Sequence, residues 1–449
     1  YREKAKYLRR SDGTTKGACR MQALNALKSR LLDLAIRGKL VPQIDGENEV
    51  EQIGKAPKEN PFEIPKKWKW VRLDDIAPYG KCERIEACSF DRDTWLLNLE
   101  DIEKDTGRLL QKNKIIKNQG AKYLFNKGDV LYSRLRPYLN KVLVADEDGV
   151  CTTEIIPLKP KENTLSGSYL SFFLKSQYFV QYAVSQSYGV KMPRVGTATD
   201  KNALVALPPL DEQKRIVEKL ESLFAKIDTI QKSIDEVSQL GASLEKQLLQ
   251  SSISGKLVPQ LDEELEVEQI GDAPEEVPFE IPEKWKWVRL ESLGTLFSGK
   301  TPKADELTSS GNIPYFKISD MNSSENQKYM RHTEHYLKTT PKKIFKAGSI
   351  IFPKNGGAVF TNKRRFLVRD SIVDLNTGGF YPNKNYLDES YAFLLLSSID
   401  FREISKGTAL PTIDSSKLKS YLVPLPPLGE QRRIVEKFEK LMLEIQKLK

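Results

Sequence analysis

The sequence lacks the residue patterns of several protein classes. Its 449 residues include only four cysteines, at positions 18, 82, 88 and 151, and none of them forms a C-x-x-C pair. This spacing argues against a zinc site and is typical of a chain in a reducing compartment. Only two histidines occur, His332 and His335, which disfavours a Ser-His catalytic site and a histidine-rich metal site. Their spacing would suit one side of a helix, where we expect a solvated pair.

Long apolar runs are also missing. The longest, such as Phe393–Leu396, are far too short to span a membrane, and no apolar segment follows the basic first residues as a secretory signal requires. Hydrophobic residues make up 39% and charged residues 29% of the chain, as in an ordered, soluble protein. We therefore expect a cytoplasmic protein of two or three domains, without a membrane partner.

Positive charge is in excess. The formal net charge is +10 and the pI is near 9.1. This excess favours a polyanionic partner, and nucleic acid is the first candidate. Many soluble proteins are mildly basic, so charge alone does not decide the matter.

The chain repeats itself at an interval of about half its length. Three segment pairs are offset by 217 residues: GKLVPQ at 38–43 and 255–260, VEQIG at 50–54 and 267–271, and PFEIPxKWKWVRL at 61–73 and 278–290. A fourth pair, offset by 218, is LPPLxEQxRIVEK at 207–219 and 425–437. So long a period predicts a tandem duplication rather than a solenoid of short repeats.

The interiors of the two copies, 74–190 and 291–405, have diverged. Faint parallels predict a shared architecture: a tight turn at Gly128 or Gly348, then a short strand, then a basic loop. Further matched features are the apolar segments 168–176 and 390–398, which predict buried helices, and Pro193 and Pro411, each 14 residues before Leu207 or Leu425. Near-identical flanking segments around divergent interiors predict two domains, here called heads, that recognise two different targets.

A long helix is expected after each LPPL segment, with Asp211 as a plausible N-cap and Gly255 as the C-terminal stop of the central helix. Apolar residues recur at heptad spacing along it: Ile216, Leu220, Leu223, Ile227, Ile230, Ile234, Val237, Gly241, Leu244 and Leu248. The chain ends offer partner positions: Leu24, Leu27, Leu31 and Leu34 near the start, and Ile434, Phe438, Leu441, Ile445 and Leu448 near the end.

The terminal helices match the two parts of the central helix. The C-terminal helix corresponds to its first part and the N-terminal helix to its last part, so we infer a circularly permuted, pseudo-two-fold arrangement of long antiparallel helices. Ile216 to Ile253 would span about 55 Å at ~1.5 Å per residue, and a DNA turn is about 34 Å. The helices would thus hold two heads roughly one to two turns apart. A coiled coil used only for dimerisation is the alternative.

These segments together resemble the specificity subunit of type I restriction–modification enzymes. The resemblance rests on the order and duplication of GKLVPQ, PFEIPxKWKWVRL and LPPLxEQxRIVEK and covers residues 21–449. It implies an α+β fold with two α/β target-recognition domains, and a chain without catalysis that recognises bipartite double-stranded DNA. It also implies two adenine-methylating modification subunits that use S-adenosylmethionine, and restriction subunits that use ATP and Mg, with no cofactor in this chain.

The expected organisation starts from Met21, where the matching helix would begin. It runs as follows: a flexible extension at 1–20, a spacer helix segment at 21–43, target-recognition domain 1 at 44–210, the central spacer helix at 211–257, target-recognition domain 2 at 258–428, and the C-terminal spacer helix at 429–449.

One segment suggests an enzyme instead. GTLFSGKT at 294–301 fits the phosphate-loop pattern G-x-x-x-x-G-K-[ST], which would open a helix after a buried strand. Pro302 follows at once, and Gly311 and Pro314 come soon after, which leaves no room for that helix. A catalytic methyltransferase loop is missing as well, since PPL at 208–210 and 426–428 lacks the leading polar residue and the aromatic. We therefore expect no catalytic or metal-binding residues.

DNA contacts are expected in loops that combine Arg, Lys and Asn donors, because guanidinium and amide groups recognise base edges and phosphates. In the first head the candidates are Ser133, Arg134, Arg136, Tyr138, Asn140, Lys141, Lys191 and Arg194. In the second head they are Lys300, Lys354, Asn355, Lys363, Arg364 and Arg365. Trp68, Trp70, Trp285 and Trp287 occur in both heads, so we expect them to pack each head against its helix. A stand-alone bipartite DNA-binding or scaffold protein remains the alternative.

Overall fold

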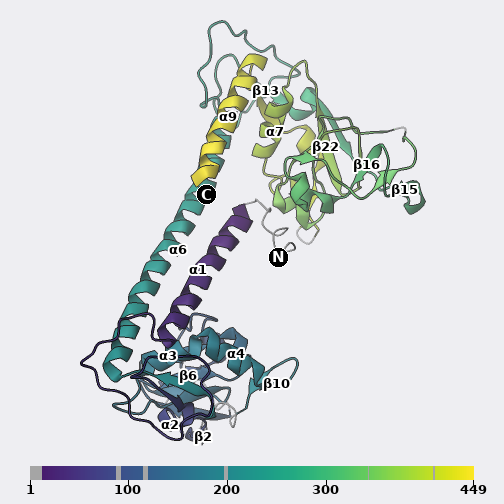
Figure 1. The fold of residues 1–449 in the computed structure, drawn as a ribbon. Helices are drawn as coiled ribbons and strands as arrows, with labels where there is room; N and C mark the ends of the chain where they lie inside the picture. The colour runs from purple at the N-terminus through teal and green to yellow at the C-terminus, as the bar shows by residue number, and fades with distance from the viewer. Residues whose placement is uncertain are drawn as a thin grey trace. The chain divides into compact units, whose positions relative to one another are not determined.

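A computed structural model describes residues 13–86, 93–114, 120–196, 201–341, 343–407 and 410–448. The chain divides into two compact units, one formed by Gly17–Ser233 and the other mainly by Ile234–Lys449. Figure 1 shows that each unit contains one mixed α/β head and that each head is attached to long helices. The predicted fold class of two α/β domains with long helices is confirmed.

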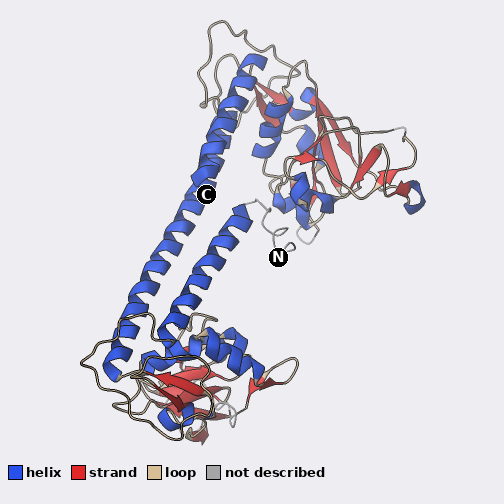
Figure 2. Ribbon diagram, viewed as in Figure 1, coloured by secondary structure: helices blue, strands red, loops and turns tan. Residues whose placement is uncertain are grey.

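The first head is built from short strands, drawn red in Figure 2. Its first and last strands, β1 (Lys69–Arg72) and β12 (Leu204–Leu207), form an antiparallel pair that brings the beginning and end of the head together. A five-stranded sheet has the order β2 (Arg84–Glu86), β5 (Ala121–Phe125), β8 (Gly149–Thr152), β3 (Trp95–Leu97) and β4 (Asn113–Lys114). A three-stranded sheet has the order β7 (Val142–Val144), β6 (Val130–Ser133) and β9 (Ile155–Leu158).

Short helices and one hairpin complete the first head. These are α2 (Leu73–Ile76), α3 (Gly167–Lys175), α4 (Gln177–Ser185) and the hairpin of β10 (Ser187–Tyr188) with β11 (Arg194–Val195). Ser166 caps α3, because its side chain accepts a hydrogen bond from Tyr169 N. Phe173 and Leu174 of this helix are fully buried, as the apolar run predicts.

The second head repeats this plan with a different interior. Its first and last strands, β13 (Lys286–Arg289) and β25 (Leu422–Leu425), also form an antiparallel pair. One sheet has the order β14 (Gly294–Ser298), β22 (Thr377–Pro382), β19 (Ile350–Pro353), β20 (Arg365–Leu367) and β17 (Tyr329–Met330). The other has the order β15 (Leu307–Thr308), β18 (Tyr336–Leu337), β16 (Ile313–Phe316) and β21 (Ile372–Val373). The hairpin of β23 (Ser405–Lys406) with β24 (Thr412–Ile413) and the helices α7 (Glu389–Ser398) and α8 (Ser415–Lys419) complete it.

The predicted turns and buried helices are confirmed in both heads. Gly128 and Gly348 have φ angles of 92° and 86°, which glycine adopts without strain, and β6 and β19 follow them. Helices α3 and α7 occupy the two apolar segments. Single turns of 3-10 helix lie at Leu99–Asp101, Pro137–Leu139, Leu290–Leu293, Ala304–Glu306, Ile318–Asn322, Ser324–Asn326 and Gly357–Thr361.

The long helices are α1 (Gly13–Ile36), α6 (Leu210–Ile253) and α9 (Leu428–Leu448). Helix α1 begins at Gly13, not at Met21, so the expected extension is partly helical; residues 1–12 lie outside the described chain. Helix α6 begins at Leu210, so Asp211 lies in its first turn and is not the N-cap. Gly255, with a φ of 72°, follows its end as predicted.

Each terminal helix packs beside α6 (Figure 1). In the first unit, Lys28 Nζ of α1 lies 2.5 Å from Asp228 Oδ1 and 5.6 Å from the Phe224 ring centre. Ile216 and Leu220 of α6 join Leu32 and Ile36 in the core of the first head. In the second unit, Ile434 and Phe438 of α9 contact the core that contains Ile253.

The apolar seam is buried only in part. The buried members are Ile216, Leu220, Ile227, Gly241, Leu248, Ile434 and Ile445, and the half-buried members are Leu24, Leu31, Leu34, Leu223, Ile234, Leu244, Phe438 and Leu441. Leu27, Ile230 and Val237 are 46%, 50% and 41% exposed, so the described part of the chain leaves them largely uncovered, and their predicted packing against a partner or spacer helix stays a prediction. The circular permutation and the composite helix stay predictions.

The repeated letters of LPPLxEQxR bind the helix to the head. Gln213 Oε1 accepts a hydrogen bond from Ser166 N at 2.8 Å, and Gln431 Oε1 accepts one from Asp388 N at the same distance. Both contacts fix the loop that precedes a buried helix, α3 or α7. The identical motifs are therefore explained by identical intramolecular contacts.

Candidate nucleic-acid interface

In the first head, three segments meet where β6 ends: the loop after β6, the turn before β9 and the β10–β11 hairpin. Arg134 N donates to Glu154 O at 3.1 Å, which joins the loop to the turn. Val195 N donates to Arg134 O at 3.1 Å, and Arg136 N donates to Pro193 O at 2.7 Å. The hairpin is thus bonded to the loop at two points.

The second head has the same three backbone hydrogen bonds after β19, and this set of bonds is called the loop frame below. Lys354 N donates to Asn376 O at 2.7 Å, and Ile413 N donates to Lys354 O at 2.9 Å. Gly356 N donates to Pro411 O at 2.8 Å. The match of the two prolines is therefore confirmed, and four positions correspond: 134 with 354, 136 with 356, 154 with 376, and 194 with 412.

One equivalent pair has an unusual backbone. Arg136 has a φ of 51° and Gly356 a φ of 77°, and both precede a 3-10 turn. Glycine adopts a positive φ freely, whereas arginine is strained there. The Arg136 Nε atom is buried and has no hydrogen-bond partner among the described residues. Backbone strain at an arginine is a feature typical of functional loops.

The first head places charged groups on this frame. The Glu154 carboxylate contacts Arg194 at 2.9 Å and Arg134 at 3.4 Å. Burial alone raises the pKa of Glu154, but the hydrogen bonds and charges of Arg194 and Arg134 hold it below its usual range. All three side chains are partly exposed, between 24% and 31%. Two guanidinium groups are thus held by one ionised carboxylate.

The second head places one cation and neutral polar groups at this loop. Asn355 Nδ2 donates to Asn376 Oδ1 at 3.4 Å and to Leu375 O at 3.3 Å. Lys354 Nζ donates to Ser298 Oγ at 3.0 Å, from the end of β14. One cation and two neutral groups therefore occupy the positions of the two guanidinium groups and the carboxylate, and Asn355 adds an amide beside them.

The other candidates of the first head divide into exposed and internal groups. Tyr138 is 51% exposed and Lys191 is exposed. Asn140 Nδ2 donates to Lys175 O at 3.1 Å, and Lys141 Nζ donates to Leu99 O at 2.6 Å. Ser133 is only 3% exposed and its hydroxyl donates to Leu135 O, so its predicted DNA contact is wrong.

The basic run of the second head does not form one surface. Lys363 is half-buried and its ammonium donates to Asn322 Oδ1. Arg364 is 3% exposed, donates to Leu396 O and Ile399 O at 3.0 Å each, and lies 3.6 Å from the Phe401 ring centre. Its predicted DNA contact is wrong, because burial encloses the whole guanidinium.

Arg365 is also engaged internally. Its guanidinium donates to Met321 O at 3.1 Å and to Arg364 O at 2.8 Å, and burial lowers its pKa. The DNA contacts predicted for Lys363 and Arg365 stay predictions.

The phosphate-loop pattern is not a phosphate loop. Its first five residues form β14, which lies at the edge of its sheet. Within the fully described segment 294–306, the only helical turn is the three-residue 3-10 turn that begins at Ala304. Lys300 is exposed, and its amide N donates to Val373 O at 2.9 Å. The helix that a phosphate loop opens is therefore missing from the described segment 294–306.

The two histidines lie in loops and turns rather than on a helix. His335 Nε2 is 2.7 Å from Lys317 Nζ, and His332 Nδ1 is 3.8 Å from Glu325 Oε2. Across the described residues, no group of three or more His, Cys, Asp or Glu side chains is placed to hold a metal ion. Of the helices described, none is long and apolar enough to cross a membrane.

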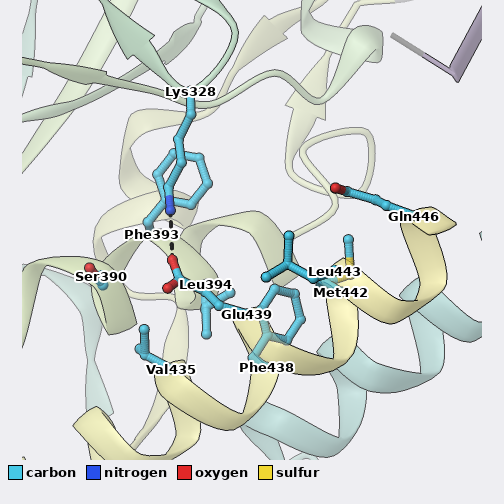
Figure 3. A pocket seen from close by; sticks show the side chains of 10 residues that line it. All are labelled: Lys328, Ser390, Phe393, Leu394, Val435, Phe438, Glu439, Met442, Leu443 and Gln446. Carbon is cyan, nitrogen blue, oxygen red and sulfur yellow. Dashed lines mark hydrogen bonds and ion pairs between the residues drawn. The ribbon is translucent and has the colours of Figure 1, made fainter. Parts of the chain in front are cut away.

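A pocket of about 400 Å³ lies between α7 and α9 of the second unit (Figure 3). Phe393, Leu394 and Phe438 supply apolar walls, and Lys328 Nζ reaches Glu439 Oε1 at 2.9 Å. The pocket shares no residue with the loops described above. Apolar walls and a paired acidic group do not suit a polyanion.

A family model matches the chain twice, over residues 65–239 and 282–449. Its description is "Type I restriction modification DNA specificity domain". The chain belongs to this family. The two matches coincide with the two α/β heads and the helices that follow them, so the duplication is a duplication of this specificity domain.

Curated relatives are similar over most of their length. The type I restriction enzyme MjaVIII specificity subunit of Methanocaldococcus jannaschii is 25% identical over 86% of this chain and 88% of its own length. The type I restriction enzyme EcoAI specificity subunit of Escherichia coli is 23% identical over 96% of this chain and 91% of its own length.

Solved structures share the fold of these specificity domains. The HsdS subunit from Thermoanaerobacter tengcongensis has a TM-score of 0.58 at 20% identity, over 87% of this chain and 93% of its own. A chain from a study of complex assembly and conformational transition in the type I R-M system has a TM-score of 0.65 at 22% identity, over 86% and 92%.

Sequence reasoning missed four residues of these specificity domains that lie at the loop frame: Glu154, Ser298, Asn376 and Thr412. They come from strand ends and a hairpin that are distant in sequence from the basic loops. The offset of about 220 residues between the heads, extended from Gly128 and Gly348, would have aligned position 154 near 376. An acidic residue, however, is not what a search for DNA contacts looks for.

Proposed function

We propose that this chain determines the DNA sequence recognised by a type I restriction–modification enzyme. Each head would recognise one half of a bipartite site in double-stranded DNA. The observation that carries the proposal is the pair of matching loop frames, identical in backbone bonding and different in side chains. A duplicated domain that keeps its loop backbone and changes the polar side chains on it is suited to recognise two different base sequences.

The chemistry of the side chains on the two loop frames supports base recognition. A guanidinium fork matches the O6 and N7 acceptors of guanine, and an asparagine amide matches adenine. Arg134 and Arg194 offer the first, and Asn355 and Asn376 offer the second. Exposed Lys191 and Lys300 would contact phosphates, and Tyr138 would contact a base or sugar.

The chain would act without catalysis of its own. The long helices would set the gap between the half-sites and bind two modification subunits, which would methylate adenine with S-adenosylmethionine. Restriction subunits would add ATP- and Mg-dependent translocation and cleavage. The exposed seam residues Leu27, Ile230 and Val237 support helices that contact other subunits. We place this assembly in the cytoplasm.

The test is co-expression with the adenine methyltransferase subunit, followed by genome-wide mapping of N6-methyladenine. The expected result is one methylated motif with two parts and an unrecognised gap. Replacement of residues 291–410 with another head should change one half of that motif and leave the other half unchanged. A soluble complex that methylates no motif would contradict the proposal and favour a stand-alone DNA-binding or scaffold protein.

A further inference from the structure

The two loop frames contain three side chains each at equivalent positions. In the first head these are Arg134, Glu154 and Arg194, the first-head cluster. In the second head they are Lys354, Asn376 and Thr412. The equivalence rests on backbone pairing, because β6 pairs with β9 up to Ser133 and Ile155, as β19 pairs with β22 up to Pro353 and Thr377.

The residues directly beyond these pairs continue the match. Arg134 N donates to Glu154 O as Lys354 N donates to Asn376 O. The hairpin strands β11 and β24 are bonded alike, because residue 195 donates to Arg134 O and residue 413 donates to Lys354 O. The backbone therefore presents each set of three from the same frame. Only the side chains distinguish the sets, one with two cations and one anion, the other with one cation and two neutral groups.

The carboxylate decides what the first-head cluster can face. An ionised Glu154 would be repelled by phosphates, so a surface meant only for the DNA backbone would not place it between two arginines. Base edges are different, since a carboxylate accepts from cytosine N4 while a guanidinium donates to guanine O6 and N7. The bonds to Glu154 also fix the orientation of both guanidinium groups before DNA binds, which reduces the entropic cost of binding.

We propose that Arg134, Glu154 and Arg194 form a base-recognition cluster for a G·C pair, with Glu154 as the residue that determines specificity. This inference rests on the proposed function of the chain. The second head, with Asn376 and Thr412 in place of Glu154 and Arg194, recognises a different base at the corresponding position of its half-site.

The test uses the purified complex of the full chain with its methyltransferase subunit. Binding to the mapped site is measured against duplexes in which each base pair of the half-sites is changed in turn. Glu154→Gln keeps the size of the side chain and removes its charge. Glu162→Gln is the matched control, because Glu162 is exposed in the same head and no ion pair of its carboxylate occurs among the described residues.

The expected result is specific to one base pair. Glu154→Gln should lower the preference for G·C at one position of the first half-site by at least about 10-fold, with no change in the second half-site. Arg194→Lys, which keeps the charge and removes the fork, should lower the same preference while the complex keeps most of its non-specific affinity. Glu162→Gln should match the wild type at every position.

Three results would overturn the inference while leaving the proposed function intact. They are a bipartite motif whose first half contains no G·C pair, an unchanged preference in Glu154→Gln, and an equal loss of binding to all sequences in Arg194→Lys. Because a sequence preference is measured, a purely structural role of Glu154 would not reproduce the expected result. A wild-type complex that recognises no bipartite motif would overturn the proposed function and this inference with it.

Discussion

Trp68 and Glu212 form a buried hydrogen bond of 2.8 Å between the start of the first head and the start of α6. Trp285 and Glu430 repeat it at 2.9 Å in the second unit. The identical KWKWVRL and EQxRIVEK segments are therefore parts of one intramolecular contact that occurs twice. They cannot distinguish the targets of the two heads, and the divergent loops must do so.

Removal of the acceptor should destabilise the joint between head and helix. Glu212→Ala leaves the Trp68 indole N–H buried without a partner, and we expect a decrease of about 1–3 kcal/mol in the free energy of unfolding of the first unit. Urea unfolding monitored by tryptophan fluorescence measures the decrease. Glu162→Ala, at an exposed position, should change it by less than about 0.5 kcal/mol. Equal effects of the two substitutions would contradict the importance of the Trp68–Glu212 bond.

The same carboxyl group should make stability depend on pH. Burial raises the pKa of Glu212 above its usual 4.5, and the hydrogen bond from Trp68 opposes this only in part. The folded state therefore binds the proton more tightly than the unfolded state, so this group's contribution to stability falls as pH rises from about 4.5 through the raised folded pKa. Glu212→Gln keeps an acceptor oxygen and removes the titration.

The difference in unfolding free energy between Glu212→Gln and wild type should accordingly grow in favour of the variant as the pH rises through that window. Glu430→Gln should behave alike in the second unit, because burial raises the pKa of Glu430 as well. Parallel stability curves for variant and wild type across the window would show that the carboxyl group does not titrate in this way.

Glycine is required where each spacer helix turns into its head. Gly38 has a φ of 66°, and a Cβ there would overlap the Pro65 ring; Gly255 has a φ of 72° and stands likewise against Pro282. We expect Gly38→Ala to destabilise the first unit by about 1–3 kcal/mol. Gly46→Ala is the control, since open space surrounds that position. Thermal unfolding that is equally affected by both substitutions would contradict this view.

Arg364 should act as a core residue rather than as a DNA contact. Arg364→Ala would remove the ring contact with Phe401 and leave two buried carbonyl groups without their donor, so we expect the second unit to be destabilised by about 3 kcal/mol or more. Lys363→Ala should have a small effect on stability. A stable Arg364→Ala variant with weakened DNA binding would reverse this assignment.

The basic run shows why some site residues escape sequence analysis. Lys363, Arg364 and Arg365 are all basic, but successive side chains near a strand point to opposite faces, so Arg364 is fully buried while its two neighbours are half-buried. Which side chain is inward depends on what packs against this segment, and Arg364 contacts carbonyl groups at the end of α7 and the Phe401 ring. The sequence repeat could predict the contacts between head and helix, because identical segments make identical contacts. It could also align Pro193 with Pro411.

Other features depend on contacts between distant segments. Glu154 becomes a candidate only when the turn before β9 is placed beside the β10–β11 hairpin, and no local pattern of TTEI shows this. The heptad spacing predicts an apolar seam but not where a partner helix ends, so Ile230 and Val237 fit the pattern and are nevertheless exposed. Periodicity reports a helix face, whereas burial requires a second surface.

Lys300 offers a test that separates DNA binding from nucleotide hydrolysis. The side chain is exposed at the end of β14, and the helix that a phosphate loop needs does not follow within the described segment 294–306. Because Lys300→Ala removes one phosphate-binding cation, it should weaken binding to all sequences alike, lower the slope of log affinity against log salt by about one, and preserve the methylated motif. Lys354→Ala, at the loop frame, should instead alter the preference within the second half-site. Complete absence of modification by a folded Lys300→Ala complex would indicate a nucleotide site after all, because one exposed phosphate-binding group cannot account for it.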